Sequence, residues 1–503
     1  MSYSQLVQPK TGLGTMADIP PAPFEMQKQR DSRSAVSATY IRGRNDKITA
    51  MSQPIPKPSG VPILGNIFDV NPSNPWESLK GLSETYGEIF QIKVLGKTLV
   101  FVAGVELAEE ICDEKRFRKF VGGPIVEIRA AVHDSLFTAY DHEESWGVAH
   151  RIMMPYLKPD AVAGYFDSMR DTALDLMEIW KSGDGVKAVV PWKDLARLDL
   201  ETLTLAFFGK RLGCLMGAEH PMIQAMEDST AEAVMRPTRL GIVNWLFYGG
   251  KFKRSNQMLR DYAESLVGYR HEHPTDRQDM LGGLLNDKDP QTGKCLTPSQ
   301  VIDEMVSMPI GSSTAPCLVA TAILFLEQNP EAKKKARKEL EAVVGGGELR
   351  HEHLSQLRYV EAVISETLRL SCAAPGFNIE PIPSKDKSPI VLGGGKYQIA
   401  HDQAMILLLA GVNKDAGTFD DPLAFKPDRW MGGEMRAGAR KWFGNGKRIC
   451  IGRHYAWQWS VTVLAVMLRE VEFQLVEPEY ELKQDGWFNV RPVGLEVRVK
   501  GRS

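Results

Sequence analysis

The chain has 503 residues, with 61 Lys and Arg against 63 Asp and Glu, and its formal net charge is −2 at pH 7. This balance gives no support for nucleic-acid binding, which usually goes with a basic protein. The length suggests several domains, but length is only a soft guide. Six cysteines are scattered without regular spacing, which argues against a disulfide framework and for a reducing compartment.

The first 54 residues are polar, with Ser, Pro and scattered charges. They lack the apolar core of a signal peptide, and acidic residues such as Asp18 and Glu25 are unusual in a transit peptide. We predict that residues 1–54 form a mobile extension and residues 55–503 one catalytic domain. An apolar run of about 18 residues, as a membrane span needs, does not occur, so we expect no transmembrane helix.

The rest of the chain divides into elements by its periodicity. The segment 56–66 is rich in Pro and Gly and should be turn-rich. Apolar stretches at 86–94 and 98–102 predict a β-hairpin, and alternation returns over 477–503. Helical spacing of apolar residues predicts helices over 173–180, 195–208, 298–327, 330–345 and 352–371.

Residues 443–452 read Phe-Gly-Asn-Gly-Lys-Arg-Ile-Cys-Ile-Gly, and a long apolar helix starts near Arg453. Cys450 is therefore predicted to lie in a turn just before a helix N-terminus. Unpaired backbone N–H groups and the helix dipole favour a thiolate at such a place.

The neighbours of this cysteine fit a flat, anionic cofactor. Gly444 and Gly446 allow close approach of the backbone, Phe443 shields the sulfur, and Arg448 offers a cation to an anionic group at the cofactor edge. Two alternatives are a buried structural cysteine and a zinc site with His454, for which no further ligands lie nearby. The whole set favours a haem held by a cysteine thiolate, a ligand that favours O–O cleavage.

The order Phe-Gly-x-Gly-x-Arg-x-Cys-x-Gly resembles the signature of the cytochrome P-450 superfamily. The segments 366–369 (Glu-Thr-Leu-Arg) and 427–430 (Pro-Asp-Arg-Trp) resemble two further motifs of that family. The resemblance implies a buried network of Glu366, Arg369 and Arg429, although the first two alone would suit a helix surface pair. It also implies a mainly α fold with a small β region, in which a long central helix crosses a buried haem b.

The resemblance covers about residues 55–500 and is strongest to the haem domain of self-sufficient fatty-acid hydroxylases, in which a flavin reductase follows. The sequence Asn-Pro-Trp-Glu-Ser-Leu at 74–79 is among the segments that carry it. By position, Trp146, His150 and Lys119 are expected to contact the haem propionates, because their N–H groups donate to carboxylates. The alternative for the first two is an ordinary helix face.

The chain departs from that subfamily at its end and in its hairpin. It ends at Ser503 without a reductase segment, so we expect a separate NADPH-dependent flavin reductase, if electrons are needed at all. Lys97 and Phe101 stand where similar enzymes offer Arg and Tyr to a carboxylate. Lys97 can still pair an acid, although a solvated lysine is the commoner case.

A third departure is the segment 240–254, which takes the place of the family's substrate-access lid. Its apolar and aromatic run is followed by Lys251, Lys253 and Arg254. Such a segment fits peripheral contact with a membrane or a lid that packs on the protein itself. We expect a cytoplasmic location, with the membrane contact left open.

The fourth departure lies in the central helix, where residues 310–316 read Ile-Gly-Ser-Ser-Thr-Ala-Pro. In the family, an acid and a threonine here pass protons to the oxygen under reaction. Thr314 is kept, but Ser313 takes the acid position, and a serine relays a proton without storing one. Pro309 and Pro316 should bend the helix. Thr314 and Ser313 are the predicted catalytic residues, and the alternative for Ser313 is bonding back to the preceding turn.

The resemblance implies a monooxygenase that oxidises an apolar small molecule with O2. A specialised metabolite is favoured over a plain fatty acid because the hairpin and the central helix are altered. Two alternatives stay open: an electron-independent haem enzyme (a hydroperoxide isomerase, dehydratase or peroxygenase) and a non-catalytic haem protein. By position, Phe137, Ala374, Ile310 and Gly311 are expected to line an apolar substrate pocket.

Overall fold

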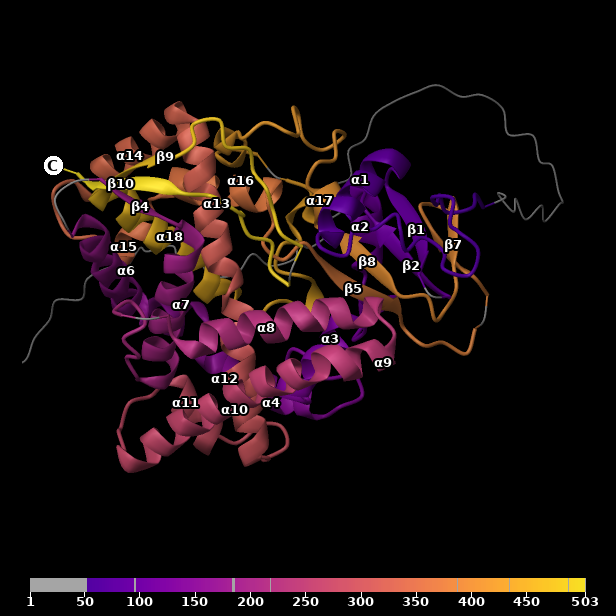
Figure 1. Cartoon of the computed structure of the whole chain (residues 1–503), viewed down its shortest axis with the longest axis horizontal. Coiled ribbons are helices and arrows are strands. Elements are labelled where there is room, and N and C mark those ends of the chain that lie inside the picture. Colours follow the sequence, from indigo (N-terminus) through magenta and orange to yellow (C-terminus); the bar gives the residue numbers. More distant parts are fainter. Residues whose placement is uncertain are drawn as a thin grey trace, which may run out of the picture. The chain divides into compact units, whose positions relative to one another are not determined.

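The computed structural model describes residues 52–502, apart from 95, 183–185, 218, 387, 434 and 487. These residues form a mainly helical fold with small sheets (Figure 1), which confirms the predicted fold class. Almost all of the predicted extension lies outside the described residues. The α-helices are α1 (Pro75–Tyr86), α2 (Val105–Ile111), α3 (Pro124–Val132), α4 (Ser145–Met153), α5 (Pro159–Ala163), α6 (Phe166–Lys181), α7 (Pro191–Phe208), α8 (Pro221–Met235), α9 (Gly241–Val243), α10 (Gly249–Glu272), α11 (Met280–Asn286), α12 (Pro298–Ser312), α13 (Thr314–Gln328), α14 (Pro330–Val344), α15 (His351–Leu354), α16 (Arg358–Leu370), α17 (Leu409–Val412) and α18 (Arg453–Glu470).

Several long helices, among them α7, α8, α12 and α14, begin with a proline. Proline suits this position because its φ is already helical and its missing N–H would have had no partner there. In α12, Thr297 adds a capping box with Gln300, in which each side chain accepts from the other residue's backbone N–H. The start of the central helix is therefore fixed by local chemistry.

The strands form three sheets, with the orders β1-β2-β8-β5-β3, β4-β10-β9 and β6-β7. The predicted hairpin is β1 paired with β2, and β8 and β5 from late in the chain lie beside it (Figure 1). The predicted strand region 477–503 is wrong over most of its length. It gives only β10 among the described residues, because Pro478 and Pro492 cannot donate to a ladder. The strands are β1 (Ile89–Val94), β2 (Lys97–Val102), β3 (Phe117–Lys119), β4 (Lys187–Val189), β5 (Gly376–Pro381), β6 (Ile390–Leu392), β7 (Tyr397–Ile399), β8 (Met405–Leu408), β9 (Val471–Leu475) and β10 (Val497–Gly501).

The centre of the core is built from α13 and α18, each of which is buried on most of its surface. A helix that is apolar all round belongs inside a protein or a membrane. The run Pro298–Gln328 is the one helical stretch among the described residues that is long and apolar enough to cross a membrane, and 78% of its apolar window is buried within the fold. The core helix of a globular protein meets the same criterion of length and apolarity. The burial of Pro298–Gln328 within the fold favours a core helix over a membrane span.

The segment 240–254 forms α9, the π-helix η3 (Asn244–Tyr248) and the start of α10. A patch of large apolar side chains is exposed here, made of Leu240, Ile242, Trp245, Leu246 and Phe247. The first basic residue after the patch, Lys251, pairs with Asp228 at 3.0 Å. Trp245 and Phe247 are thus turned away from the described part of the protein, whereas Phe252, later in the segment, is buried in its core.

Candidate active site

Cys450 lies between the 3-10 turn η6 (Gly446–Arg448) and α18. Its N–H donates to the carbonyl of Phe443 at 2.8 Å, which closes the turn. Gly444 and Gly446 have φ of 84° and 59°, values that other residues rarely adopt. A Cβ on Gly446 would also lie 2.0 Å from the Glu114 carboxylate. Both glycines are therefore needed for the turn that presents the cysteine.

The Cys450 side chain is enclosed by the fold, and yet its surface is exposed to an internal cavity. Burial raises the pKa of the thiol, whereas the N–H of Gly452 and the charges of Arg453 and Lys119 act in the opposite direction. Gly452 precedes α18, so its N–H is one of those that favour an anion at a helix start. A metal cation at the sulfur would outweigh the effect of burial and hold the thiolate.

The cavity in front of Cys450 has a volume of about 1550 Å³. A pocket for one drug-sized ligand has roughly 300–1,000 Å³, so this cavity has room for a flat cofactor and a substrate. Phe137, Ala374, Ile310 and Gly311, the predicted pocket residues, all line it. A Cβ added to Gly311 would meet no atom within 4 Å, so the glycine leaves open space at the wall.

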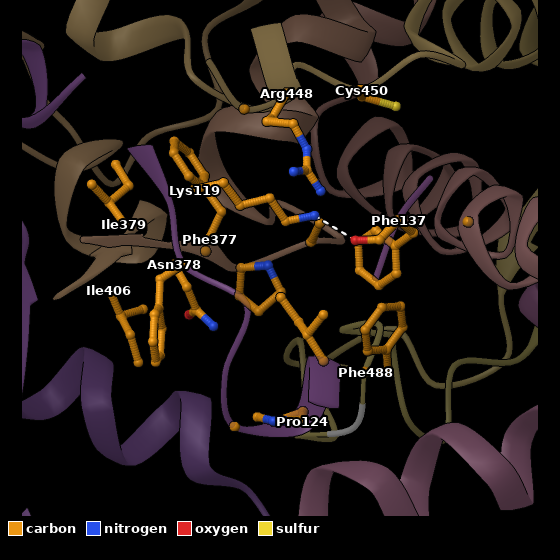
Figure 2. Close-up of a pocket in the computed structure, with 18 of the residues that line it drawn as sticks. Lys119, Pro124, Phe137, Phe377, Asn378, Ile379, Ile406, Arg448, Cys450 and Phe488 are labelled. Atoms are coloured by element: carbon orange, nitrogen blue, oxygen red, sulfur yellow. Dashed lines mark hydrogen bonds between the residues drawn. The ribbon is translucent and has the colours of Figure 1, made fainter. Parts of the chain in front are cut away.

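A group of cationic and N–H-bearing side chains lines the same cavity. The Trp146 ring stacks on His150 with centroids 5.1 Å apart and has the Arg448 guanidinium 5.2 Å from its centre. Lys119 Nζ donates to the carbonyl of Phe137 at 2.6 Å, close to the Arg448 side chain (Figure 2). Burial, with a contribution from Arg448, lowers the pKa of Lys119 to about 7. Burial also lowers the pKa of Arg448 to about 10.

These lowered pKa values have a common cause, because both cations are held out of water; for Lys119 the nearby charge of Arg448 adds to the effect. An anionic group placed among them would stabilise their charged forms. Haem b carries two propionates and an iron that binds a thiolate. The described residues offer positive charge and N–H donors to the propionates, and they offer the Cys450 sulfur to the iron. The site therefore fits haem b.

Glu366 of α16 ties together the segment that precedes the cysteine turn. Its fully buried carboxylate accepts from Arg369 Nε and Nη2 at 2.8 Å, from Arg429 Nε at 3.0 Å and from Trp430 Nε1 at 2.8 Å. The N–H of Lys426 donates to it as well. Burial raises the pKa of Glu366, but the hydrogen bonds and charge of Arg369 outweigh it and leave the pKa lowered. The carboxylate is thus ionised and fully satisfied.

Comparison with known proteins agrees with this geometry. The family model described as cytochrome P-450 matches residues 55–498. The chain belongs to the cytochrome P-450 family. Haem with a cysteine thiolate ligand is the cofactor that this family implies.

Two relatives show how much of their length the match covers. A bifunctional cytochrome P-450/NADPH–P-450 reductase of Aspergillus oryzae is 36% identical over 455 residues, which are 89% of this chain and 41% of the relative. A self-sufficient cytochrome P-450 monooxygenase of Exserohilum turcicum is 34% identical over 454 residues, which are 89% of this chain and 42% of the relative. The chain spans about two fifths of the length of these curated relatives.

The central helix is interrupted where the cytochrome P-450 pattern has its acid. The helix α12 ends at Ser312 and α13 begins at Thr314, since a proline inside α12 weakens its last turn. Ser313 Oγ donates to the carbonyl of Ile310 at 2.8 Å and accepts from Asn489 Nδ2 at 2.5 Å. Ser313 is thus bonded back to its own turn and does not belong to the described lining of the cavity.

The residues on either side of this break do reach the cavity. Thr314 lines it, and its hydroxyl donates to the Gly311 carbonyl at 3.2 Å. Ser312 also lines it, and its hydroxyl donates to the Asp199 carboxylate at 2.6 Å. Of the two predicted catalytic residues, the structure brings Thr314 to the cavity, and Ser312 takes the place expected of Ser313.

Sequence reasoning missed three residues of this site. Glu304 Oε1 accepts from the N–H of Leu136 at 2.7 Å and so fixes the loop that carries Phe137. The ring of Phe488 meets that of Phe137 edge to face, with centroids 6.0 Å apart (Figure 2). The third is Asp199. Asp199 and Glu304 are acids at inward positions of apolar helices, a pattern that signals a buried polar role. Phe488 lies in an irregular segment without such a signal.

Proposed function

We propose that this chain is a haem-thiolate monooxygenase that inserts one oxygen atom of O2 into an apolar small molecule, with electrons from a separate NADPH-dependent flavin reductase. The observation that carries the proposal is the Cys450 sulfur, which faces a large cavity shared with Gly311 and Thr314. The printed names of the two relatives, which include a monooxygenase and an NADPH–P-450 reductase, support it.

The reaction balances as RH + O2 + NADPH + H⁺ → ROH + H2O + NADP⁺. Bound haem supplies the activation of O2, which a thiolate axial ligand favours. The chain's own residues hold the substrate and handle the protons. Apolar walls exclude water, Phe137 and Phe488 restrict which substrate carbon approaches, and the Thr314 hydroxyl offers a hydrogen bond to the oxygen atom that leaves as water.

We take the substrate to be a specialised metabolite and not a plain fatty acid. Apolar side chains dominate the cavity wall, a composition that suits a compact apolar molecule. Lys97 is exposed at the start of β2 and also lines the cavity. Phe101 is buried and stacked on Phe90 with centroids 5.0 Å apart. Among the described hairpin residues that line the cavity, Lys97 is the one cation that could meet a carboxylate, and none carries a phenol.

The exposed patch of α9 and η3 supports contact of residues 240–254 with a membrane surface, on a protein otherwise located in the cytoplasm. Trp245 and Phe247 are 72% and 74% exposed, and the basic residues Lys253 and Arg254 follow in α10. Aromatic side chains next to basic ones bind anionic membrane interfaces. Sedimentation with anionic vesicles should pull down the protein, and Trp245→Ser with Phe247→Ser should release it. A wild-type protein that stays in solution would exclude this contact.

The function is tested by the dependence of turnover on a reductase. Apolar compounds are first screened by the optical shift that a fitting ligand causes in the haem spectrum. The best ligand is then incubated with O2, NADPH and added reductase, with Cys450→Ser as the matched control because it replaces only the sulfur. We expect an oxygenated product when all components are present and none when the reductase is omitted.

Two other results would replace the proposal. Consumption of a hydroperoxide without any reductant, together with no NADPH-dependent product, would identify an electron-independent haem enzyme. Ligand binding without turnover under either condition would identify a non-catalytic haem protein.

A further inference from the structure

Asp199 is a buried acid beside the broken part of the central helix. It lies on α7, is 4% exposed, and accepts from the Ser312 hydroxyl through Oδ2 at 2.6 Å. Its other oxygen, Oδ1, has no hydrogen-bond partner among the described residues. Burial raises the pKa of this carboxyl to about 7, against a small opposing effect of the Ser312 hydrogen bond. The side chain therefore holds a proton that it can release near neutral pH.

The groups that face Asp199 do not neutralise it. Ser312 approaches from α12. Burial raises the pKa of the Cys317 thiol on α13 and of the Tyr455 phenol on α18, and the charge of Asp199 adds to both effects. No cation forms an ion pair with Asp199 in the described part of the chain. The Tyr455 hydroxyl is likewise buried without a partner among those residues.

We propose that Asp199 supplies protons, through the Ser312 hydroxyl, to the oxygen atom that leaves as water. It thereby replaces the acid that the family pattern places on the central helix and that this chain lacks. This inference rests on the proposed monooxygenase function. Ser312 is the link because, among the described residues, it is the one that both hydrogen-bonds to Asp199 and lines the cavity.

Each transfer moves one proton and no electrons. In the structure the Ser312 hydroxyl donates to Asp199 Oδ2, so the relay begins when the protonated carboxyl donates to Ser312 Oγ instead and the Ser312 hydrogen turns toward the cavity. The Ser312 Oγ–H bond then breaks as its proton passes to an acceptor in the cavity, and the proton of the Asp199 carboxyl forms the new Oγ–H bond. Asp199 is left as a carboxylate and is reprotonated by one H⁺ taken up from the solvent. Two such cycles deliver the two protons that enter the product water. A general acid with a pKa near the working pH is best suited to this task.

A purely structural role is the competing interpretation, since Asp199 also accepts a hydrogen bond that holds the end of α12. The variant Asp199→Asn separates the two roles. An asparagine carbonyl still accepts from Ser312, but the side chain can no longer store an acidic proton. Glu201→Gln is the matched control, because Glu201 is a buried acid on the same helix whose carboxylate accepts from the N–H groups of Leu212 and Cys214.

The first measurement is independent of turnover. Infrared difference spectra of the haem-loaded protein should show a carbonyl stretch from protonated Asp199 with a titration midpoint near pH 7, alongside the stretch of Glu304, whose pKa burial raises to about 8. The test concerns the band with the midpoint near pH 7. That band should be absent from Asp199→Asn and present in Glu201→Gln. Ser312→Ala should keep the band and shift its frequency, because the hydrogen bond is lost. A wild-type spectrum whose carboxyl band is unchanged in Asp199→Asn would overturn the proposal.

The second measurement is the yield of product per NADPH. Asp199→Asn and Ser312→Ala should each lower this yield about tenfold or more, release the difference as hydrogen peroxide, and leave the dissociation constant from the optical shift within about twofold. In wild type the yield should fall as pH rises through about 7, where Asp199 loses its stored proton, and this dependence should vanish in Asp199→Asn. Glu201→Gln should keep the wild-type yield and pH profile.

A single-oxygen donor such as iodosylbenzene completes the test, because its reaction with RH needs no protons. Turnover with this donor should be equal in wild type and Asp199→Asn. If it falls in parallel with the NADPH-driven yield, the role of Asp199 is structural and the proposal fails. If Asp199→Asn couples as well as wild type, the proposal also fails while the monooxygenase function stands. If wild type gives no NADPH-dependent product at all, the proposed function fails first, and the relay has no reaction to serve.

Discussion

The network around Glu366 shows how strongly one buried charge holds the segment before the cysteine turn. Glu366→Gln keeps the shape of the side chain and removes its charge. The charge of Arg369 would then stay buried without its partner, because the side chains of Glu366 and Arg369 are both 0% exposed. Removing one partner of a buried ion pair costs about 3–5 kcal/mol, because the other charge stays buried. The glutamine amide also turns a donor toward N–H groups, and an unsatisfied buried group adds about 1–3 kcal/mol.

We therefore expect Glu366→Gln to lower the free energy of unfolding by at least about 3 kcal/mol, a large share of the roughly 5–15 kcal/mol of a typical protein. Urea unfolding at pH 7, followed by circular dichroism, measures the change. Lys426→Met is the control. It removes an exposed pair with Asp421 at 2.8 Å but keeps the N–H that donates to Glu366, and it should cost about 0–1 kcal/mol. A loss below about 1 kcal/mol in Glu366→Gln would refute the reasoning.

The pH dependence of this difference has a definite sign. Burial raises the pKa of Glu366, but its hydrogen bonds to Arg369, Lys426 and Trp430 leave it lowered in the fold. A carboxyl with a lowered pKa stabilises the protein above its unfolded pKa of about 4.3 and loses this effect as pH falls through the folded value. The gap between wild type and Glu366→Gln should therefore narrow in acid, and a gap that widens would contradict this assignment.

Three further predictions concern the haem side of the molecule. Cys450→Ala should abolish the red-shifted CO band of the reduced protein, because the thiolate ligand is lost. Charge reversal at Lys441 and Lys447 should slow haem reduction by the reductase, most at low salt, and leave the substrate-induced optical shift unchanged. Unaltered rates would place docking elsewhere. Thr314→Ala should lower product per NADPH and raise peroxide release by about tenfold, since one hydrogen bond to a charged group is worth roughly 1.5–3 kcal/mol. Ser313→Ala should slow turnover less, and equal effects would contradict the assignment of Thr314.

The cysteine turn was predictable because its chemistry is local. The glycines, the cysteine and the helix that follows lie within one short stretch, and positive φ at Gly444 and Gly446 follows from residue type. The mainly helical fold was predictable for a similar reason, since long segments such as α13 carry an unbroken apolar pattern. The resemblance to a family supplied what periodicity could not, the pairing of Glu366 with Arg429 across 63 positions of sequence.

The region around Ser313 shows a feature that the sequence alone does not determine: which serine faces the cavity. In an α-helix each residue is turned by about 100° from the one before, so a local break changes which of two neighbouring serines faces the cavity. Pro309 and Pro316 predicted a bend in the central helix, but the direction of that bend depends on how the helix packs against α7. The partner of Ser312, Asp199, lies 113 positions away. Such a contact leaves no local pattern. The one sequence signal that could have indicated Asp199 is the presence of an acid at an inward position of an apolar helix.

The position of Asp199 behind Ser312 has a consequence for the chemistry of the cavity. A carboxyl that faced the cavity directly would lose or gain water as each substrate entered, and its pKa would follow the substrate. Asp199 is buried between α7 and the broken central helix, so its desolvation is set by the fold. Proton supply from Asp199 is then separated from substrate fit, because Ser312 and Thr314 line the cavity while Asp199 does not. Substitutions in the apolar wall of such a pocket, at Phe137 or Phe488, should therefore leave the pKa of Asp199 unchanged.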